Sequence, residues 1–107
     1  MNDDDVPLLQ TRTSHRIFTY VITENLNTTY EEARVFEFGI ECTVTNRKGI
    51  IISYKHIRCI SPDFNKVYGI ALLLRQHRVY PEHMTDIIED LLTLDKLPEI
   101  IKYEISA

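Results

Sequence analysis

Hydrophobic and polar residues alternate with a period of two in three segments of the chain, residues 16–23, 34–45 and 50–59. The alternating residues are mostly aromatic or β-branched, which is typical of half-buried β-strands. Residues 24–33, rich in Asn, Thr and Glu, are interpreted as the loop between the first two strands. The residues that share the apolar faces of the first two segments are Phe18, Tyr20, Ile22, Phe36, Phe38, Ile40, Cys42 and Val44.

The turn between the second and third strands is predicted from its residue types. Asn46 suits the first position of a type I turn, and Gly49 suits the left-handed position that follows. This is the three-residue hairpin loop with a glycine bulge, and it pairs Val44 with Ile52. Further along, the apolar phase slips by one residue, which predicts a β-bulge near residues 55 and 56.

Two helices are predicted after the strands, over residues 62–77 and 81–93. Ser61 suits the N-cap of the first helix, with Pro62 in its first turn. Pro81 opens the second helix, whose apolar residues recur at the spacing of a single helix face. The residues of that face are Met84, Ile87, Ile88, Leu91 and Leu92.

These elements predict an α+β fold, a three-stranded antiparallel meander with two helices packed on one face. Residues 1–15 are interpreted as a flexible N-terminal tail, residues 16–93 as a single domain and residues 94–107 as a C-terminal extension. In the extension, apolar residues stand at every second position from 101 to 105. This pattern predicts a short C-terminal strand, which would pair with an open sheet edge of its own subunit or of a neighbour.

Composition narrows the class of protein further. A chain of 107 residues with 44% hydrophobic residues is typical of one soluble domain. The net charge of -4 does not favour nucleic acid or an anionic membrane as a partner, and no apolar run is long enough to span a bilayer. Cys42 and Cys59 are too few for a disulfide framework, and the chain starts without a secretory signal. We therefore expect a cytoplasmic protein.

Five residues are candidates for a site, if one exists. His83 and Asp86, three positions apart on the second helix, could serve a metal or an acid–base pair, but an enzyme metal site normally draws three ligands, so a structural role is favoured. His56 and Cys59 could be ligands only if a bulge brings them to the same side of their strand. Tyr80 either anchors a partner or fills the gap between the helices, and the second role is favoured. The sequence predicts no catalytic residue, cofactor or metal.

Three segments carry a resemblance to a known family. They are Phe38-Gly39-Ile40-Glu41 in the second strand, Ile57-Arg58-Cys59-Ile60-Ser61-Pro62-Asp63 before the first helix, and VYPEHMTDIIEDLL at 79–92. Together they resemble a family of small bacterial proteins, mostly from Gram-positive spore-formers, that is known only as a domain of unknown function. The specific part is the closing-helix pattern Val-x-Pro-x-His-x-x-Asp-x-Ile-Glu-Asp, and the similarity covers residues 17–93. The family strand has tyrosine in place of Phe38. The resemblance implies a bacterial cytoplasmic protein and adds no catalytic residue.

The outer sheet face and the open edges lead to a hypothesis on function. A non-catalytic protein-interaction or regulatory module is favoured, with a protein partner or self-association as a homodimer. The first alternative is a small-molecule-binding protein or enzyme with a site near His83 and Asp86. The second is nucleic-acid binding, which the small basic clusters at 47–48 and 75–78 do not favour. The outer face mixes apolar and polar residues: Ile17, Thr19, Val21, Val35, Glu37, Glu41, Ile51 and Ser53.

Overall fold

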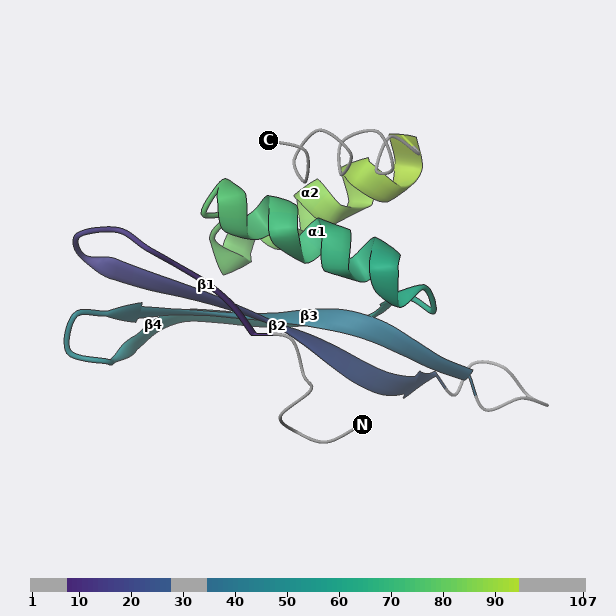
Figure 1. Cartoon of the computed structure of the whole chain (residues 1–107), viewed down its shortest axis with the longest axis horizontal. Coiled ribbons are helices and arrows are strands. Elements are labelled where there is room, and N and C mark those ends of the chain that lie inside the picture. Colours follow the sequence, from purple (N-terminus) through teal and green to yellow (C-terminus); the bar gives the residue numbers. More distant parts are fainter. Residues whose placement is uncertain (1–7, 28–34, 95–107) are drawn as a thin grey trace.

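The chain folds into one antiparallel sheet with two helices on a single face (Figure 1). The computed structural model describes residues 8–27 and 35–94. The four strands follow one another across the sheet in chain order. The elements are β1 (Leu8–Arg12), β2 (Arg16–Asn27), β3 (Val35–Asn46), β4 (Ile51–Ser61), α1 (Phe64–Gln76) and α2 (Pro81–Leu94).

The α+β class, the antiparallel sheet and the two helices are confirmed, but the predicted number of three strands is wrong. The additional strand is β1, in a segment that the sequence pattern placed in the N-terminal tail, residues 1–15. Only Leu9 of β1 is buried, opposite Tyr20 of β2. One buried apolar residue in a five-residue strand leaves no detectable alternation. The predicted C-terminal strand, near 101–105, lies outside the described residues.

The core lies between the helices and the inner face of the sheet. α1 packs over all four strands, mainly β2, while α2 packs over β3 and β4. The predicted inner faces of β2 and β3 are buried from Phe18 to Ile22 and from Ile40 to Val44. Each such side chain stabilises the fold by roughly 1.5–3 kcal/mol relative to exposure, so the sheet needs both helices as cover. The helices contribute Val67, Ile70, Ala71, Leu73, Leu74, Met84 and Ile88 to this core.

The three-residue loop between β3 and β4 is confirmed. The backbone N–H of Asn46 donates to the carbonyl of Ile50 at 2.9 Å, and that of Gly49 donates to the carbonyl of Asn46 at 3.0 Å. The Asn46 side chain accepts from the backbone N–H groups of Lys48 and Ile50. Gly49 has a φ of +80°, the left-handed conformation that the turn requires.

The predicted register beyond this loop is wrong. Val44 lies opposite Ser53 rather than Ile52, because Ile52 is the additional residue of a bulge next to the turn. The bulge predicted near residues 55 and 56 therefore comes three residues earlier in the chain. Its position turns Ile57 toward the helices, where it packs against the core. This register also puts polar residues on the inner side of β4, which an edge strand tolerates because long side chains there reach solvent.

A second irregularity lies at the other end of β4. Phe38 pairs with Ser61 and Ile40 pairs with Ile57, so β4 has two residues more than β3 between these pairs. Cys59, within this excess, has a φ of +54°. The β4 backbone lies so close to Gly39 that a Cβ atom there would overlap the carbonyl oxygen of Ile57. Gly39 therefore permits the bulge that carries the chain toward α1.

The first helix begins later than its sequence predicts. Asp63, not Ser61, is the N-cap: its carboxylate accepts from the backbone N–H groups of Asn65 at 3.0 Å and Lys66 at 3.4 Å. The Ser61 hydroxyl oxygen instead accepts from the N–H of Asp63 at 3.1 Å. Pro62 thus lies in the turn before the helix, and both acceptors satisfy backbone donors at this end of α1.

Candidate functional site

The two candidates on α2, His83 and Asp86, are both exposed. The backbone N–H of His83 donates to the carbonyl of Tyr80 at 3.0 Å, which is part of the first turn of the helix. Within residues 8–27 and 35–94, no group of three or more His, Cys, Asp or Glu side chains could hold a metal ion. Among the described residues, these two side chains therefore lack the additional ligands that a metal site needs.

The candidates on β4 take part in the sheet itself. His56 lies half-buried on the outer face, with Nε2 2.8 Å from Oγ1 of Thr23. The Thr23 hydroxyl donates its only hydrogen bond to Oδ1 of Asn25 at 3.0 Å. Toward His56 the same oxygen therefore acts as the acceptor, and Nε2 of His56 is the donor. Cys59 lies in the bulge opposite Gly39 and is a free, half-buried thiol. Both residues are thus engaged in shaping one end of β4.

The connection between the helices is fixed to the sheet by two aromatic residues. The ring of Tyr80 stands edge-on to that of Phe18 in β2, with 4.9 Å between centroids and an interplanar angle of 77°. The hydroxyl of Tyr20 donates to the carbonyl of Val79 at 2.7 Å. Tyr80 is still 37% exposed. It packs against Phe18 of the sheet, and part of its surface remains exposed to solvent.

The inner face of the sheet holds one thiol, that of Cys42, directly opposite Tyr20. Both side chains are fully buried. Burial raises the pKa of the Cys42 thiol to about 12, and it also raises the pKa of the Tyr20 hydroxyl. A thiol that stays protonated at neutral pH is a poor nucleophile, and both side chains of this pair belong to the buried core.

Stability should therefore depend on pH in the alkaline range. In the unfolded chain the Cys42 thiol ionises near its ordinary pKa of 9.0, whereas in the fold it keeps its proton up to about 12. The stabilisation is complete below pH 9 and is lost as pH rises toward 12. We expect the free energy of unfolding to fall in this window by about 1.4 kcal/mol per pH unit for this thiol. Urea melts at a series of pH values measure this. We expect the free energy of unfolding to fall less steeply with pH in Cys42→Ala than in the wild type.

The matched control is Cys59→Ala, which removes the other thiol and leaves the buried one in place. We expect Cys42→Ala to weaken the dependence of the free energy of unfolding on pH more than this control does. The buried Tyr20 contributes a slope of the same sign, and Cys42 also raises the pKa of Tyr20, so Cys42→Ala removes part of the tyrosine contribution together with that of the thiol. Equal slopes for wild type and Cys42→Ala would contradict the prediction.

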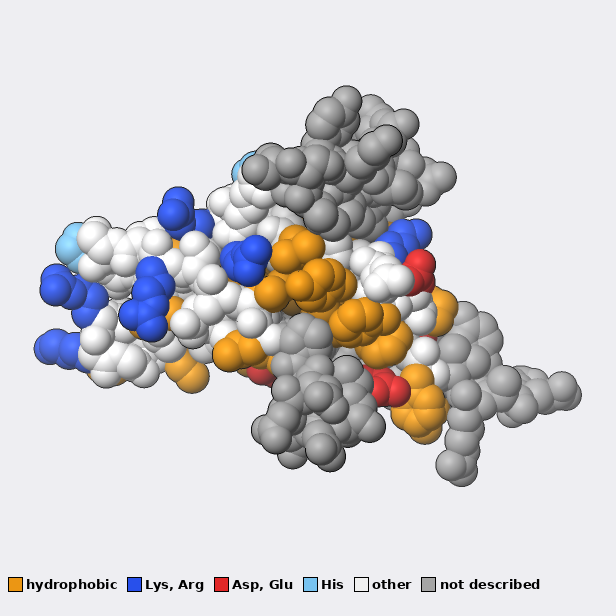
Figure 2. Space-filling model, viewed as in Figure 1, with side chains coloured by type: hydrophobic (Ala, Val, Ile, Leu, Met, Phe, Trp, Pro, Cys, Tyr) orange, Lys and Arg blue, Asp and Glu red, His pale blue; other side chains and the backbone are white. Residues whose placement is uncertain are grey.

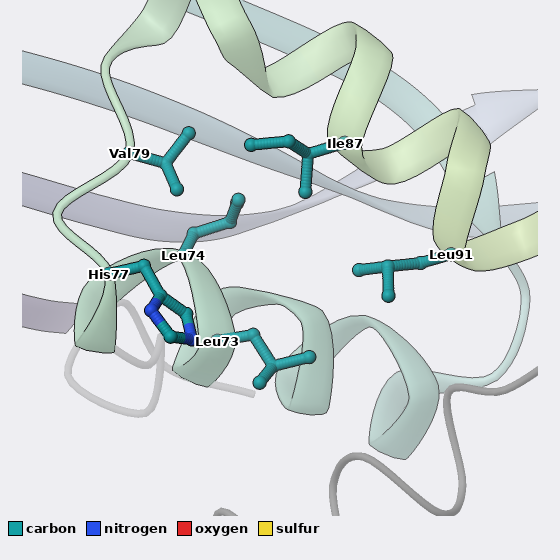
Figure 3. Close-up of a pocket in the computed structure, with 6 residues that line it drawn as sticks. All are labelled: Leu73, Leu74, His77, Val79, Ile87 and Leu91. Carbon is teal, nitrogen blue, oxygen red and sulfur yellow. The ribbon is translucent and has the colours of Figure 1, made fainter.

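A cavity of about 240 Å³ lies between the two helices (Figure 3). Its walls are side chains of α1, of α2 and of the segment that joins them. Apart from one imidazole the lining is apolar, so the cavity is suited to apolar contact rather than to polar chemistry. The lining residues are Leu73, Leu74, His77, Val79, Ile87 and Leu91.

The centre of the outer sheet face is polar and internally hydrogen-bonded. The hydroxyl of Tyr54 donates to Oε2 of Glu41 at 2.9 Å, and this bond raises the pKa of the tyrosine. Gln10 Nε2 donates to Oγ1 of Thr19 at 3.1 Å across β1 and β2. Together with the hydrogen bond between His56 and Thr23, these side-chain bonds satisfy polar groups from all four strands. This part of the face is suited to contact with water.

Exposed apolar residues gather instead at the start of β4. Ile50, Ile51, Ile52 and Tyr54 are 56%, 61%, 45% and 55% exposed, and they make up four of the eight exposed large hydrophobic residues in the described chain. β4 is an edge strand, and no other described strand pairs with its outer side. A concentration of apolar side chains on an open edge is unusual, because edges are commonly protected by charges, proline or short length.

Cations surround this apolar segment. Residues 6–23 and 42–62, which hold the two hairpin loops and the adjoining parts of the strands, contain six of the twelve Lys and Arg residues and none of the sixteen Asp and Glu residues. Figure 2 shows Lys and Arg side chains gathered at the end of the molecule where the two hairpin loops lie. A hollow of about 320 Å³ opens between these loops, lined by His15, Arg16, Asn46, Arg47, Lys48 and Ile50.

This basic end was not among the predicted site residues. The total charge of -4 concealed it, because the acidic residues lie in other parts of the chain. The signal that would have found it is the absence of Asp and Glu from two separate segments. Only the antiparallel pairing of β2 with β3, which places Arg16 opposite Asn46, brings the two segments together.

The comparisons with known proteins identify a family. A family model described as "Family of unknown function (DUF6514)" matches residues 8–94. A search of the curated proteins and a search of the solved structures each found no match. Among the described residues, neither helix has the length and apolar character needed to cross a membrane. The matched range begins at β1 and ends with α2, so it coincides with the described fold.

Proposed function

The chain belongs to DUF6514, a family of unknown function, and we propose that it is a non-catalytic protein-interaction module that binds an extended segment of a partner along the open edge of β4. The observation that carries the proposal is the group of exposed apolar residues on that edge, Ile50, Ile51, Ile52 and Tyr54. Addition of a strand to an exposed sheet edge is a recurrent mode of peptide recognition, in which the backbone supplies hydrogen bonds and alternate side chains supply specificity.

The backbone geometry supports this mode. The carbonyl of Ile50 accepts from Asn46 and so faces β3. Because neighbouring residues of a strand direct their N–H and C=O groups to opposite sides, those of Ile51 face the open side. A partner strand can bond to them without disturbing the pairing of β3 with β4. The Ile51 side chain, 61% exposed, would then gain an apolar contact.

A reducing bacterial cytoplasm is part of the proposal. Both cysteines of the chain are free thiols, a state that such a compartment preserves. The sequence resemblance implies a Gram-positive origin, which agrees with this compartment. That origin is inferred from the closing-helix pattern of α2.

The proposal predicts that the edge isoleucines are required for partner recovery. We expect the double variant Ile51→Thr, Ile52→Thr to recover its partner from the native host at least about tenfold less well than wild type, because interface anchors commonly cost more than 1 kcal/mol each. Threonine keeps the β-branched shape, and the positions are exposed, so the melting temperature should change little. Affinity purification with quantitative mass spectrometry measures the recovery.

Leu8→Thr is the matched control. Leu8 is 62% exposed and lies on β1, the opposite edge of the same sheet. This variant loses one exposed apolar side chain from the edge that the proposal does not use, and it should recover the partner as wild type does. Equal recovery by wild type and the double variant would show that the β4 edge is not the binding surface.

A further inference from the structure

We propose that the partner segment is acidic at one end, and that its carboxylates bind in the basic hollow between the β1–β2 and β3–β4 loops. The inference rests on the proposed function and names the chemistry of the partner. It is a binding site for the side chains of Asp and Glu in a peptide whose remaining residues are apolar and β-branched.

The hollow offers cations from two separate parts of the chain. Arg16 comes from the start of β2, while Arg47 and Lys48 come from the β3–β4 loop. The Arg16 guanidinium donates to the carbonyl of His15 at 3.0 Å, which uses one of its five N–H donors. Arg47 and Lys48 are exposed at the tip of their loop. Guanidinium groups match carboxylates in geometry as well as in charge, so such a hollow is suited to acidic side chains.

The hollow is continuous with the apolar edge. Ile50 lines it and is also the first residue of the exposed run that continues through Ile51 and Ile52. β3 and β4 lie between Arg16 and the open edge, so a segment that pairs with β4 reaches the hollow by continuing past Ile50 and folding across the β3–β4 loop. The charge steers the approach and sets the direction of the bound strand, while the apolar contacts slow its release.

Charge also argues against a second copy of this chain on the same edge. Residues 42–62 contain no acid, and β4 itself carries Lys55 and Arg58. Two antiparallel β4 edges would bring Arg47 and Lys48 of one copy near these cations of the other. Like charges across an interface cost energy, so an acidic partner is favoured.

Nucleic acid is the other anion to consider. It would be held by phosphate contacts alone, and the apolar residues from Ile50 to Ile52 would gain nothing from it. A protein that binds single strands also needs aromatic side chains on which bases stack. The aromatic residue on this edge, Tyr54, donates its hydroxyl hydrogen bond to Glu41, and this carboxylate would repel phosphate. The observations therefore favour a peptide.

The test is a selection from random displayed peptides of about ten residues, long enough for one strand. The full-length protein is used as wild type, as the tip variant Arg47→Glu, Lys48→Glu, and as a control with the same change in charge on α1, Lys66→Glu, Arg75→Glu. We expect wild type and control to enrich peptides with Asp or Glu at one end and β-branched residues elsewhere. The tip variant should lose the acidic preference.

Affinities of the selected peptides give the second measurement. We expect the tip variant to bind them about tenfold more weakly than wild type, and to lose less affinity between about 50 and about 200 mM salt, because fewer ion contacts remain to be screened. One outcome would overturn this inference and leave the proposed function standing. In that outcome the selected peptides contain no acidic residues, and their binding is lost in the double variant Ile51→Thr, Ile52→Thr.

Two other results would overturn it. If selected peptides keep their affinity in the isoleucine double variant as well as in the tip variant, the β4 edge is not used and both proposals fail. If a single-stranded oligonucleotide of about twenty nucleotides binds wild type at low salt more tightly than any selected peptide, the hollow is a phosphate site and the peptide inference fails.

Discussion

Gly39→Ala is expected to destabilise the protein by at least about 3 kcal/mol, or to prevent folding, because the added methyl group has no space and overpacking of a rigid site is costly. A Cβ atom at this position would overlap the carbonyl oxygen of Ile57 and would lie 3.0 Å from both the Cα atom of Arg58 and Oγ1 of Thr23. Two of these three neighbours are backbone atoms, which cannot rotate away. Denaturant melts followed by circular dichroism measure the loss.

Gly49→Ala is the control for this substitution. Gly49 has a φ of +80°, yet nothing lies within 4 Å of the position that its Cβ would take. Its cost should be limited to the left-handed conformation, about 1–2 kcal/mol. A smaller loss for Gly39→Ala than for Gly49→Ala would mean that β4 moves away from β3 easily at the bulge.

Phe18→Ala is the second substitution for which we expect a large effect, a loss of about 3–5 kcal/mol. Phe18 is 1% exposed and supports the ring of Tyr80, so its removal leaves a cavity beneath the connection between the helices. The loss includes the edge-to-face contact of the two rings. Urea melts measure it, and an increased rate of amide hydrogen exchange at Val79 would report loosening of that connection.

Phe36→Ala removes the same side chain from a different environment. Phe36 is 53% exposed on β3, so its truncation should cost well under half as much as that of Phe18. Similar losses at the two positions would contradict the assignment of Phe18 to the centre of the core.

Long apolar patterns predicted the fold well. The inner faces of β2 and β3 and the apolar stripe of α2 follow the expected periods because tertiary packing on one face selects for them. β1 escaped detection because a five-residue strand with one buried residue carries no such period. The bulge at Ile52 was misplaced because β4 is an edge strand. Lys55 lies on the inner side of this strand, opposite Cys42. The hydrophobicity of a β4 residue therefore does not indicate which face of the sheet its side chain is on.

The candidate site was harder to predict from sequence. Histidines, cysteines and carboxylates attract attention as reactive groups, and His56, Cys59, His83 and Asp86 were selected on that ground. Their surroundings in the described residues do not converge on a common point. The basic hollow depends on two loops that are about thirty residues apart in sequence and become neighbours only through sheet register.

The bulge at Ile52 has a consequence for solubility. Three consecutive isoleucines followed by Ser53 and Tyr54 form the kind of uncharged, β-prone segment that stacks into fibrils when its edge is regular. A bulge interrupts the even spacing of donors and acceptors and increases the local twist, which disfavours repeated in-register stacking of identical copies along this edge but leaves the outward-facing groups of Ile51 open to a single partner segment. Arg47, Lys48 and Lys55 flank the segment and add electrostatic repulsion between copies. The same irregularity that obscured the register thus allows an apolar edge to stay open without seeding aggregation.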